Sequence, residues 1–385
     1  MRAAVVEEIS ALPALEWNAL SDGENPFVRH EFLLALERSG CIGADAGWQP
    51  WFVTLSDERG LAAAVPAWLK NHSYGEFVFD FAWAQAYARA GLAYYPKLVV
   101  AAPFTPATGP RLLVRNDLPH ETIAAHLLKA VGERADALGL QTTHVLFPDA
   151  RDRAMLENSD GWLLRRDCQF HWRNRDYRDF EDFLATFSAD KRKKAKRERR
   201  RVAEMGVTFE TRFGDEATEA DIDTAFTLHR VNFLRHGNEP YLNRAAFFAL
   251  AAAMGRAFMM KFARLGDRIV AVAIFFVGAQ TLYGRYWGAI DDFHSLHFET
   301  CYHQGVEFCI ANGLLHFEPG TQGEHKVSRG FEPVLVHSAH RIRDPRFRAA
   351  IADYLRREGA SVDEYAAGVR EHVPYRADLV IGRNA

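Results

Sequence analysis

Residues 261–277 read KFARLGDRIVAVAIFFV, two apolar runs on either side of the polar turn Gly266-Asp267-Arg268. Apolar runs of this length around a short glycine-containing turn are typical of a β-hairpin. Residues 51–66, WFVTLSDERGLAAAVP, repeat this pattern about half a chain earlier, with the turn at 56–60. The repeat predicts that the chain consists of two halves with a similar architecture.

The same order of elements follows each hairpin. Each half continues with a strand, a loop, a helix that stops at a glycine, and a buried strand. This order favours an α/β fold with mixed sheets, in which a crossover helix joins two parallel strands. The loop after the first of these strands then lies at the strand's carboxyl end, where α/β sheets favour ligands. The predicted helices are 120–138 and 297–312, and the strands after them are 143–147 and 314–318.

A length of 385 residues is enough for two domains of ordinary size. Apolar residues make up 48% and charged residues 25%, which is typical of globular proteins rather than disordered ones. The polar stretch 149–160 marks the expected connection. We predict an N-terminal half at 1–155, a C-terminal half at 156–345, and a helical tail at 346–385 that packs on the N-terminal half.

The sequence lacks the patterns typical of a signal peptide, a membrane span, a structural disulfide and a metal site. The N-terminal residues carry acids within their apolar stretch, unlike a signal peptide. No window approaches 18 apolar residues without charge, and the four cysteines form no CxxC pair. We therefore expect a cytoplasmic chain without a membrane span, a structural disulfide or a metal site. No P-loop, GxSxG elbow or Rossmann glycine motif is present.

A strongly basic run, KRKKAKRERRR, occupies residues 191–201 and carries a local charge of +8. Ser188 before it fits an N-cap, and the helix should extend to about Glu204. One interpretation is a solvated surface helix. The other is an anion site for the phosphates of a nucleotide, a lipid carrier or RNA, since dense like charges repel one another without an anionic partner. The expected anion-binding residues are Lys191, Arg192, Lys194 and Arg197.

The densest polar cluster is EPGTQGEHK at 318–326, directly after the last predicted strand of the second half. Glu324 and His325 are the candidate general bases for an amine nucleophile. Lys326 and Arg285 are candidates to stabilise the negative charge of an acyl-transfer intermediate. Gln322 and Arg329 are expected substrate contacts. The alternative is a charged loop with internal salt bridges.

Further substrate contacts are expected from both halves. In the second half, the strand-to-helix stretch after Arg285 supplies candidates, with capping of the helix start as the alternative role for His297 and Glu299. The acids and histidines of this strand-to-helix stretch do not have the spacing of a recognised metal-binding motif. In the first half, the aromatic stretch 77–95 is expected to line an acceptor pocket, with ordinary core packing as the alternative. The candidates are Trp287, His297, Glu299 and Tyr302, and Arg29, His30, Asp80, Trp83, Tyr87, Lys97 and Thr105.

Four segments resemble the bacterial peptidoglycan biosynthesis/recognition proteins, Fem-like members of the GNAT acyltransferase superfamily. They are NPFVRHEFLLALERSG (25–40), YYPKLVVAAPFTPATGPRLL (94–113), YWGAIDDFHSLHFETCYHQGVEF (286–308) and GTQGEHKVSRGFEP (320–333). The last of these is the most specific. The basic segment 188–207 is also similar to the first helix of Fem-type second domains. The resemblance covers nearly the whole chain and implies two fused GNAT-like domains.

The resemblance implies an N-acyltransferase that transfers an acyl or aminoacyl group directly to an amine. No cofactor is expected to be tightly bound; acyl-CoA or aminoacyl-tRNA would be the co-substrate, and a small-molecule or lipid-linked amine the acceptor. The R/Q-x-x-G-x-G/A loop typical of acetyl-CoA enzymes is missing from 103–110 and 288–296, so the donor stays open. Two alternatives remain: a non-catalytic binding module for a cell-wall or lipid-linked fragment, and a tRNA-binding protein.

Overall fold

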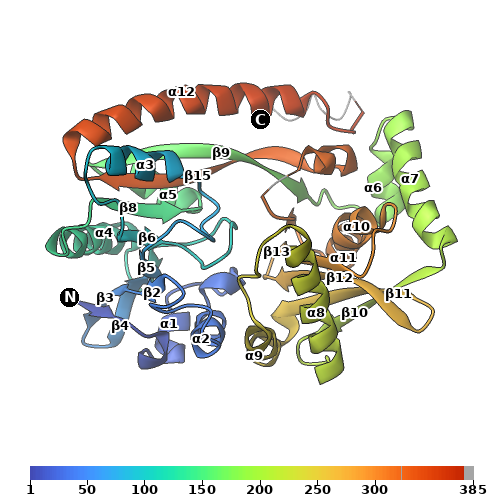
Figure 1. Ribbon diagram of the computed structural model, residues 1–385, viewed down its shortest axis with the longest axis horizontal. Coiled ribbons are helices and arrows are strands. Elements are labelled where there is room, and N and C mark those ends of the chain that lie inside the picture. Colours follow the sequence, from blue (N-terminus) through green and yellow to red (C-terminus); the bar gives the residue numbers. More distant parts are fainter. Residues whose placement is uncertain (322, 377–385) are drawn as a thin grey trace. The chain divides into compact units, whose positions relative to one another are not determined.

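The computed structural model describes residues 1–321 and 323–376 (Figure 1). The chain divides into two compact units, each described separately below. Unit 1 contains Met1–Asp167 and Leu335–Asp363, and unit 2 contains Cys168–Val334 and the segment from Glu364 onward. Among the described residues, no helix combines the length and apolar character needed to cross a bilayer.

Unit 1 contains both sheet and helix elements. One sheet has the order β1-β3-β4-β7, and further strands follow the order β15-β8-β6-β5-β2. The strands are β1 (Arg2–Val6), β2 (Trp48–Pro50), β3 (Phe52–Asp57), β4 (Gly60–Val65), β5 (Ala67–Lys70), β6 (Lys97–Val100), β7 (Leu113–Val114), β8 (Thr142–Leu146) and β15 (Glu332–Ile342). The helices are η1 (Ile9–Ala11), α1 (Ala14–Asn18), η2 (Pro26–Val28), α2 (His30–Arg38), α3 (Phe81–Arg89), α4 (His120–Ala137) and α5 (Ala150–Glu157).

The predicted hairpin of the first half is confirmed as β3 and β4, which pair in antiparallel register. The predicted crossover is confirmed as well, because β6 and β8 are parallel and α4 joins them. Pro66 separates β4 from β5, and a proline without an N–H group interrupts the ladder there. The hairpin therefore belongs to a sheet of its own with β1 and β7, a feature that the repeat did not predict.

Unit 2 has strands in the order β10-β11-β12-β13-β14-β9, with β13 and β14 parallel. Its strands are β9 (Trp162–Arg173), β10 (Val207–Phe213), β11 (Phe258–Leu265), β12 (Arg268–Val277), β13 (Thr281–Ala289) and β14 (His316–Glu318). Its helices are α6 (Phe180–Ala185), α7 (Ala189–Glu204), α8 (Glu219–Arg235), α9 (Arg244–Met254), η3 (Gly255–Ala257), α10 (Leu296–Phe298), the π-helical η4 (Glu299–His303), α11 (Gln304–Ala311) and η5 (Glu324–Arg329).

The predicted hairpin of the second half is confirmed as β11 and β12, and the crossover as α10, η4 and α11 between β13 and β14. Helix α8 packs on β13 (Figure 1). This contact needs a glycine at 288, since a Cβ atom there would lie 2.1 Å from the Leu228 carbonyl oxygen. The core of this unit is rich in aromatic residues, among them Trp172, Phe183 and Phe317.

The divisions between the units differ from the predicted boundaries at 155/156 and 345/346. They fall at 167/168, 334/335 and 363/364, inside β9, β15 and the helix α12 (Pro345–Arg370). A polar linker was the predicted signal, but these elements are regular throughout. The tail is one helix rather than two, and its first part to Asp363 belongs to unit 1. Residues 377–385 of the predicted tail lie outside the described residues.

Candidate active site

Two segments that the sequence analysis singled out separately line one cavity in unit 2. The cavity has a volume of about 790 Å³. Its walls come from the basic helix α7, from the loop before η4, and from η5 with its GEHK motif. The lining residues are Lys194, Arg197, Glu198, Arg201, Asp292, Phe293, His294, Ser295, His297, Phe298, His325, Ser328 and Arg329.

One face of α7 supplies the cations of this cavity. Lys194, Arg197 and Arg201 follow one another at three and four residues, a spacing that places them on the same side of a helix. All three are exposed. Among the described residues, no acidic group lies within 4.0 Å of Lys194 or Arg197, although the charge of Lys194 helps to lower the pKa of Glu198. Unpaired cations around a cavity favour an anionic ligand.

The other basic residues of the run have different surroundings. Arg199 points inward and donates to Glu299 and Glu307, which fastens α7 to η4 and α11. Lys196 pairs with Glu181 and Arg200 with Glu204. The predicted anion contacts Lys191 and Arg192 do not line the cavity. Ser188 occupies the N-cap position as predicted, but its side chain makes no capping hydrogen bond.

Glu198, the one acid of the basic run, connects α7 to the GEHK segment. Arg329 donates to both of its carboxylate oxygens at 2.9 Å. The same guanidinium lies over the Phe298 ring, 3.5 Å from its centre. Burial lowers the pKa of Arg329, while Glu198 opposes the shift. Glu198 was not among the predicted site residues, although a single acid among nine basic residues is the signal for an internal partner.

The imidazole of His325 is the group in this cavity best placed to accept a proton. Its Nε2 lies 2.8 Å from the Tyr302 hydroxyl. Although His325 is exposed to solvent, the partial burial of its ring, with the charges of Lys326 and Arg329, lowers its pKa to about 4. The ring is therefore neutral at pH 7, and Nδ1 keeps its lone pair when Nε2 donates to Tyr302. Gly323 leaves room for the ring, since a Cβ atom there would lie 2.1 Å from Cε1.

The other predicted catalytic residues lie differently. Lys326 is buried and donates to the Gly320 carbonyl at 2.6 Å, and burial lowers its pKa to about 7. Glu324 is exposed and accepts from the Tyr365 hydroxyl at 2.8 Å. Arg285 lies on β13 beside the Tyr286 ring and does not line the cavity. Gln322 lies outside the described residues.

The predicted substrate contacts of the second half divide into two groups. His297 lines the cavity, where burial lowers its pKa to about 4, and Tyr302 contacts His325. Glu299 is buried and occupied by Arg199 and Gln304. The Trp287 ring packs on His297 with centres 5.2 Å apart and does not line the cavity. Glu299 and Trp287 thus support the walls from behind.

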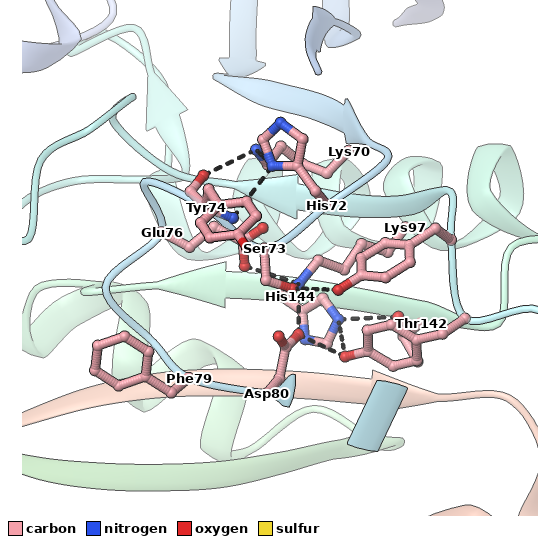
Figure 2. Close-up of polar contacts among 12 residues, drawn as sticks. Lys70, His72, Ser73, Tyr74, Glu76, Phe79, Asp80, Lys97, Thr142 and His144 are labelled. Atoms are coloured by element: carbon pink, nitrogen blue, oxygen red, sulfur yellow. Dashed lines mark hydrogen bonds and ion pairs between the residues drawn. The ribbon is translucent and has the colours of Figure 1, made fainter. Parts of the chain in front are cut away.

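Two predicted residues of the first half, Asp80 and Lys97, meet in a buried polar cluster of unit 1 (Figure 2). The Lys97 ammonium donates to Asp80, and to Ser73 and Glu76 at 2.8 Å each. Tyr94 donates to Asp80 at 2.6 Å, and its hydroxyl lies 3.4 Å from the Nε2 of His144. The Nδ1 atoms of His144 and His340 are 2.7 Å apart.

Charge inside this cluster is shared between one cation and two acids. Burial alone would raise the pKa of Asp80, but Lys97 lowers it to about 2. Burial raises the pKa of Glu76 to about 7 despite Lys97. Three members of this cluster were not among the predicted site residues: Ser73, Glu76 and His144. The sequence offered one indication for Glu76, because Glu76 and Asp80 are the only acids between residues 59 and 116. Since Lys97 is fully buried, the cluster fastens the loop 71–80 from within.

The remaining first-half candidates make internal contacts. Trp83 and Tyr87 are buried against His340 and Phe347, which fits the core alternative. Their apolar rings face the interior of unit 1 because α3 is amphipathic. His30 lies 3.0 Å from the carbonyls of Ile9 and Leu12, Thr105 donates to Pro103, and Arg29 pairs with Glu31.

With this geometry established, comparison with known proteins gives the family. The FemAB-like family model, described as peptidoglycan biosynthesis/recognition, matches residues 8–377. The chain belongs to the FemAB-like family. This confirms the resemblance drawn from the motifs at 25–40, 94–113, 286–308 and 320–333. Among curated proteins, none matches this chain.

Solved structures similar to this FemAB-like chain confirm the predicted fold class, an α/β protein with mixed sheets. One is the C-terminal domain of a putative lysylphosphatidylglycerol synthetase from Agrobacterium fabrum, with 10% identity, coverage of 89% of this chain and 95% of that one, and a TM-score of 0.55. L-PGS from Bacillus licheniformis is 11% identical, with coverage of 88% of this chain and 98% of that one and a TM-score of 0.52. FemX is 10% identical, with coverage of 91% of this chain and 100% of that one and a TM-score of 0.54.

Proposed function

We propose that this FemAB-like protein transfers an acyl or aminoacyl group from a phosphate-bearing donor to an amine. The observation that carries the proposal is the cavity of unit 2. Three exposed cations of α7 line it together with the neutral imidazole of His325 and the guanidinium of Arg329. A phosphate site and a proton acceptor therefore share one cavity, as transfer from a charged donor to an amine requires.

The reaction follows from these groups. The phosphates of the donor bind to Lys194, Arg197 and Arg201, which positions its acyl carbonyl toward η5. The neutral amine nitrogen attacks this carbonyl, and a C–N bond forms. His325 accepts the proton that the nitrogen loses, and the donor's ester or thioester bond breaks as its oxygen or sulfur leaves and takes up that proton. Arg329, held by Glu198, adds positive charge where the carbonyl oxygen becomes negative.

Aminoacyl-tRNA is the donor that this cavity favours. The three cations span eight residues of α7, about 10 Å of helix, which suits several phosphates of a nucleic acid. The loop that grips the pyrophosphate of CoA in acetyltransferases is missing from 288–296. The family description points to an amine of a peptidoglycan precursor as the acceptor.

The test is a transfer assay with mass-spectrometric readout. Purified protein is incubated with charged tRNA or with acyl-CoA, each in the presence of peptidoglycan precursors and simple amines. We expect a new amide on the acceptor with charged tRNA. Tight binding of a precursor without any transfer would support a binding module instead. Binding of tRNA without transfer to any amine would support an RNA-binding role.

Charge removal from α7 should weaken donor binding in a salt-dependent way. In the variant Lys194→Gln/Arg197→Gln/Arg201→Gln, the slope of log affinity for tRNA against log salt should fall by about 2 to 3, since each lost phosphate contact removes about 0.7 to 0.9. Fluorescence anisotropy at several salt concentrations measures this slope.

The matched control shifts each substitution by one residue. Lys193→Gln/Lys196→Gln/Arg200→Gln removes the same charge from the same helix, but these residues do not line the cavity. Its slope should stay closer to that of the wild type. Equal losses in the two variants would mean that α7 acts only through its overall charge.

A further inference from the structure

Unit 1 holds a second cavity that the proposed transfer does not use. It has a volume of about 600 Å³ and lies among α5, β9, β15 and α12. A volume of this size is typical of sites for small molecules. The lining residues are Arg153, Glu157, Leu163, Leu164, Arg166, Leu335, His337, Ala352, Leu355, Arg356 and Gly359.

One part of the cavity wall is cationic, and Arg153 dominates it. Arg166 pairs with Asp363, and Arg356 pairs with Asp353. Arg153 has no acidic partner among the described residues, although Glu157 follows one helical turn later. Its Nε atom is buried and has no hydrogen-bond acceptor there. A buried donor of this kind is destabilising as long as it lacks an acceptor.

His337 lies beside this guanidinium, 3.4 Å from Nη1 to Nε2. Burial and the charges of Arg153 and Arg166 lower the pKa of His337, so its ring is neutral at pH 7. Gly359 allows Arg166 to lie against α12, since a Cβ atom there would be 3.1 Å from the guanidinium. The cationic wall is thus held in place by neighbours on three elements.

The rest of the wall is aliphatic. Leu163 and Leu164 come from β9, Leu335 from β15, and Ala352 and Leu355 from α12. Leu335 is 37% exposed, which is unusual for a leucine that faces other leucines. Covering such surface with an apolar chain is favourable by roughly 25 cal/mol for each Å² buried.

We propose that this cavity binds an aliphatic carboxylate. The carboxylate accepts hydrogen bonds from the Nη atoms of Arg153, a paired arrangement that guanidinium and carboxylate groups favour. The chain packs against the leucines. One unpaired cation suits a single negative charge, and the nearby carboxylate of Glu157 disfavours a doubly charged phosphate.

Isothermal titration calorimetry of the full chain tests this proposal with octanoate, octylamine and inorganic phosphate. We expect octanoate alone to bind. Arg153→Gln should weaken its binding about tenfold or more, since a charge-assisted pair is lost. Arg151→Gln, an exposed position on the same helix outside the cavity, should leave it unchanged. Leu335→Glu should abolish binding by placing a second carboxylate in the cavity, at a position exposed enough to tolerate it.

Three results would overturn the proposal. Equal binding of octylamine would show that the head group is not recognised. Binding of phosphate with displacement of octanoate would assign the cavity to a different anion. Unchanged affinity in Arg153→Gln, with intact thermal unfolding, would place octanoate elsewhere on the protein. None of these outcomes bears on acyl transfer, which the assay with charged tRNA tests separately.

Discussion

Replacing Lys97 by methionine should lower the free energy of unfolding by about 3–5 kcal/mol, the range for breaking a buried ion pair from one side. Lys97 is fully buried and holds the carboxylates of Glu76 and Asp80. Without the ammonium, Glu76 and Asp80 lose the one cation that contacts them both. Urea unfolding at pH 7, followed by tryptophan fluorescence, measures the change.

Lys70 provides a matched control for this substitution. It is the direct cross-strand partner of Lys97 in the pairing of β5 with β6, and it is equally buried. It has no acidic partner within 4.0 Å among the described residues, and its ammonium lies 3.8 Å from the centre of the Trp48 ring. Burial lowers the pKa of Lys70 to about 7. Lys70→Met should therefore lower the free energy of unfolding by less than Lys97→Met does, because it removes a hydrogen bond to the Tyr74 carbonyl at 3.2 Å but no ion pair. Equal losses would mean that packing, rather than charge, is what Lys97 contributes.

The effect of Lys97→Met should also depend on pH. The pKa of Asp80 is about 2 in the folded protein and 3.8 for a free side chain, so its stabilising contribution is present above pH 3.8 and is lost as the pH falls toward 2. The difference in the free energy of unfolding between wild type and Lys97→Met should therefore become smaller as the pH falls over this range. A constant gap would contradict the assigned pair.

Replacing His325 by glutamine should lower kcat for amide formation by about 10²-fold. General-base catalysis contributes about 10²–10⁴-fold, and a base with a pKa of about 4 belongs at the low end of that range. The pH profile gives an independent check. Because the imidazole loses its proton near pH 4, the acidic limb of kcat should lie near pH 4 rather than near 6.5, and it should disappear in the variant.

Two controls separate His325 from its neighbours. His294→Gln changes another histidine that lines the same cavity and should leave kcat within a few-fold of wild type. Glu324→Gln tests the other predicted base, which is exposed and bonded to Tyr365, and a small effect is expected. A large loss in Glu324→Gln with full activity in His325→Gln would reverse the assignment of the base.

The sequence by itself determined the elements that local pattern controls. Apolar spacing, glycines and charge act over a few residues, and they were enough to predict three kinds of element. These are the hairpins at 51–66 and 261–277, the crossover helices, and the basic helix 189–204. The motifs at 25–40, 94–113, 286–308 and 320–333 indicated the family that the family model shows. That chemistry centres on the segment 320–326 stays a prediction, and the proposed site is built on it.

Only the tertiary structure decided which of these side chains meet. Within one basic run, Arg199 turns inward to Glu299 while Lys194 and Arg197 line a cavity, and composition cannot distinguish them. Glu198 reaches Arg329 across 131 positions of the chain. Lys97 finds its acids on a loop about 20 residues earlier. Ion pairs and cavities depend on how helices and strands pack, and that packing is set by the whole core rather than by any local stretch of sequence.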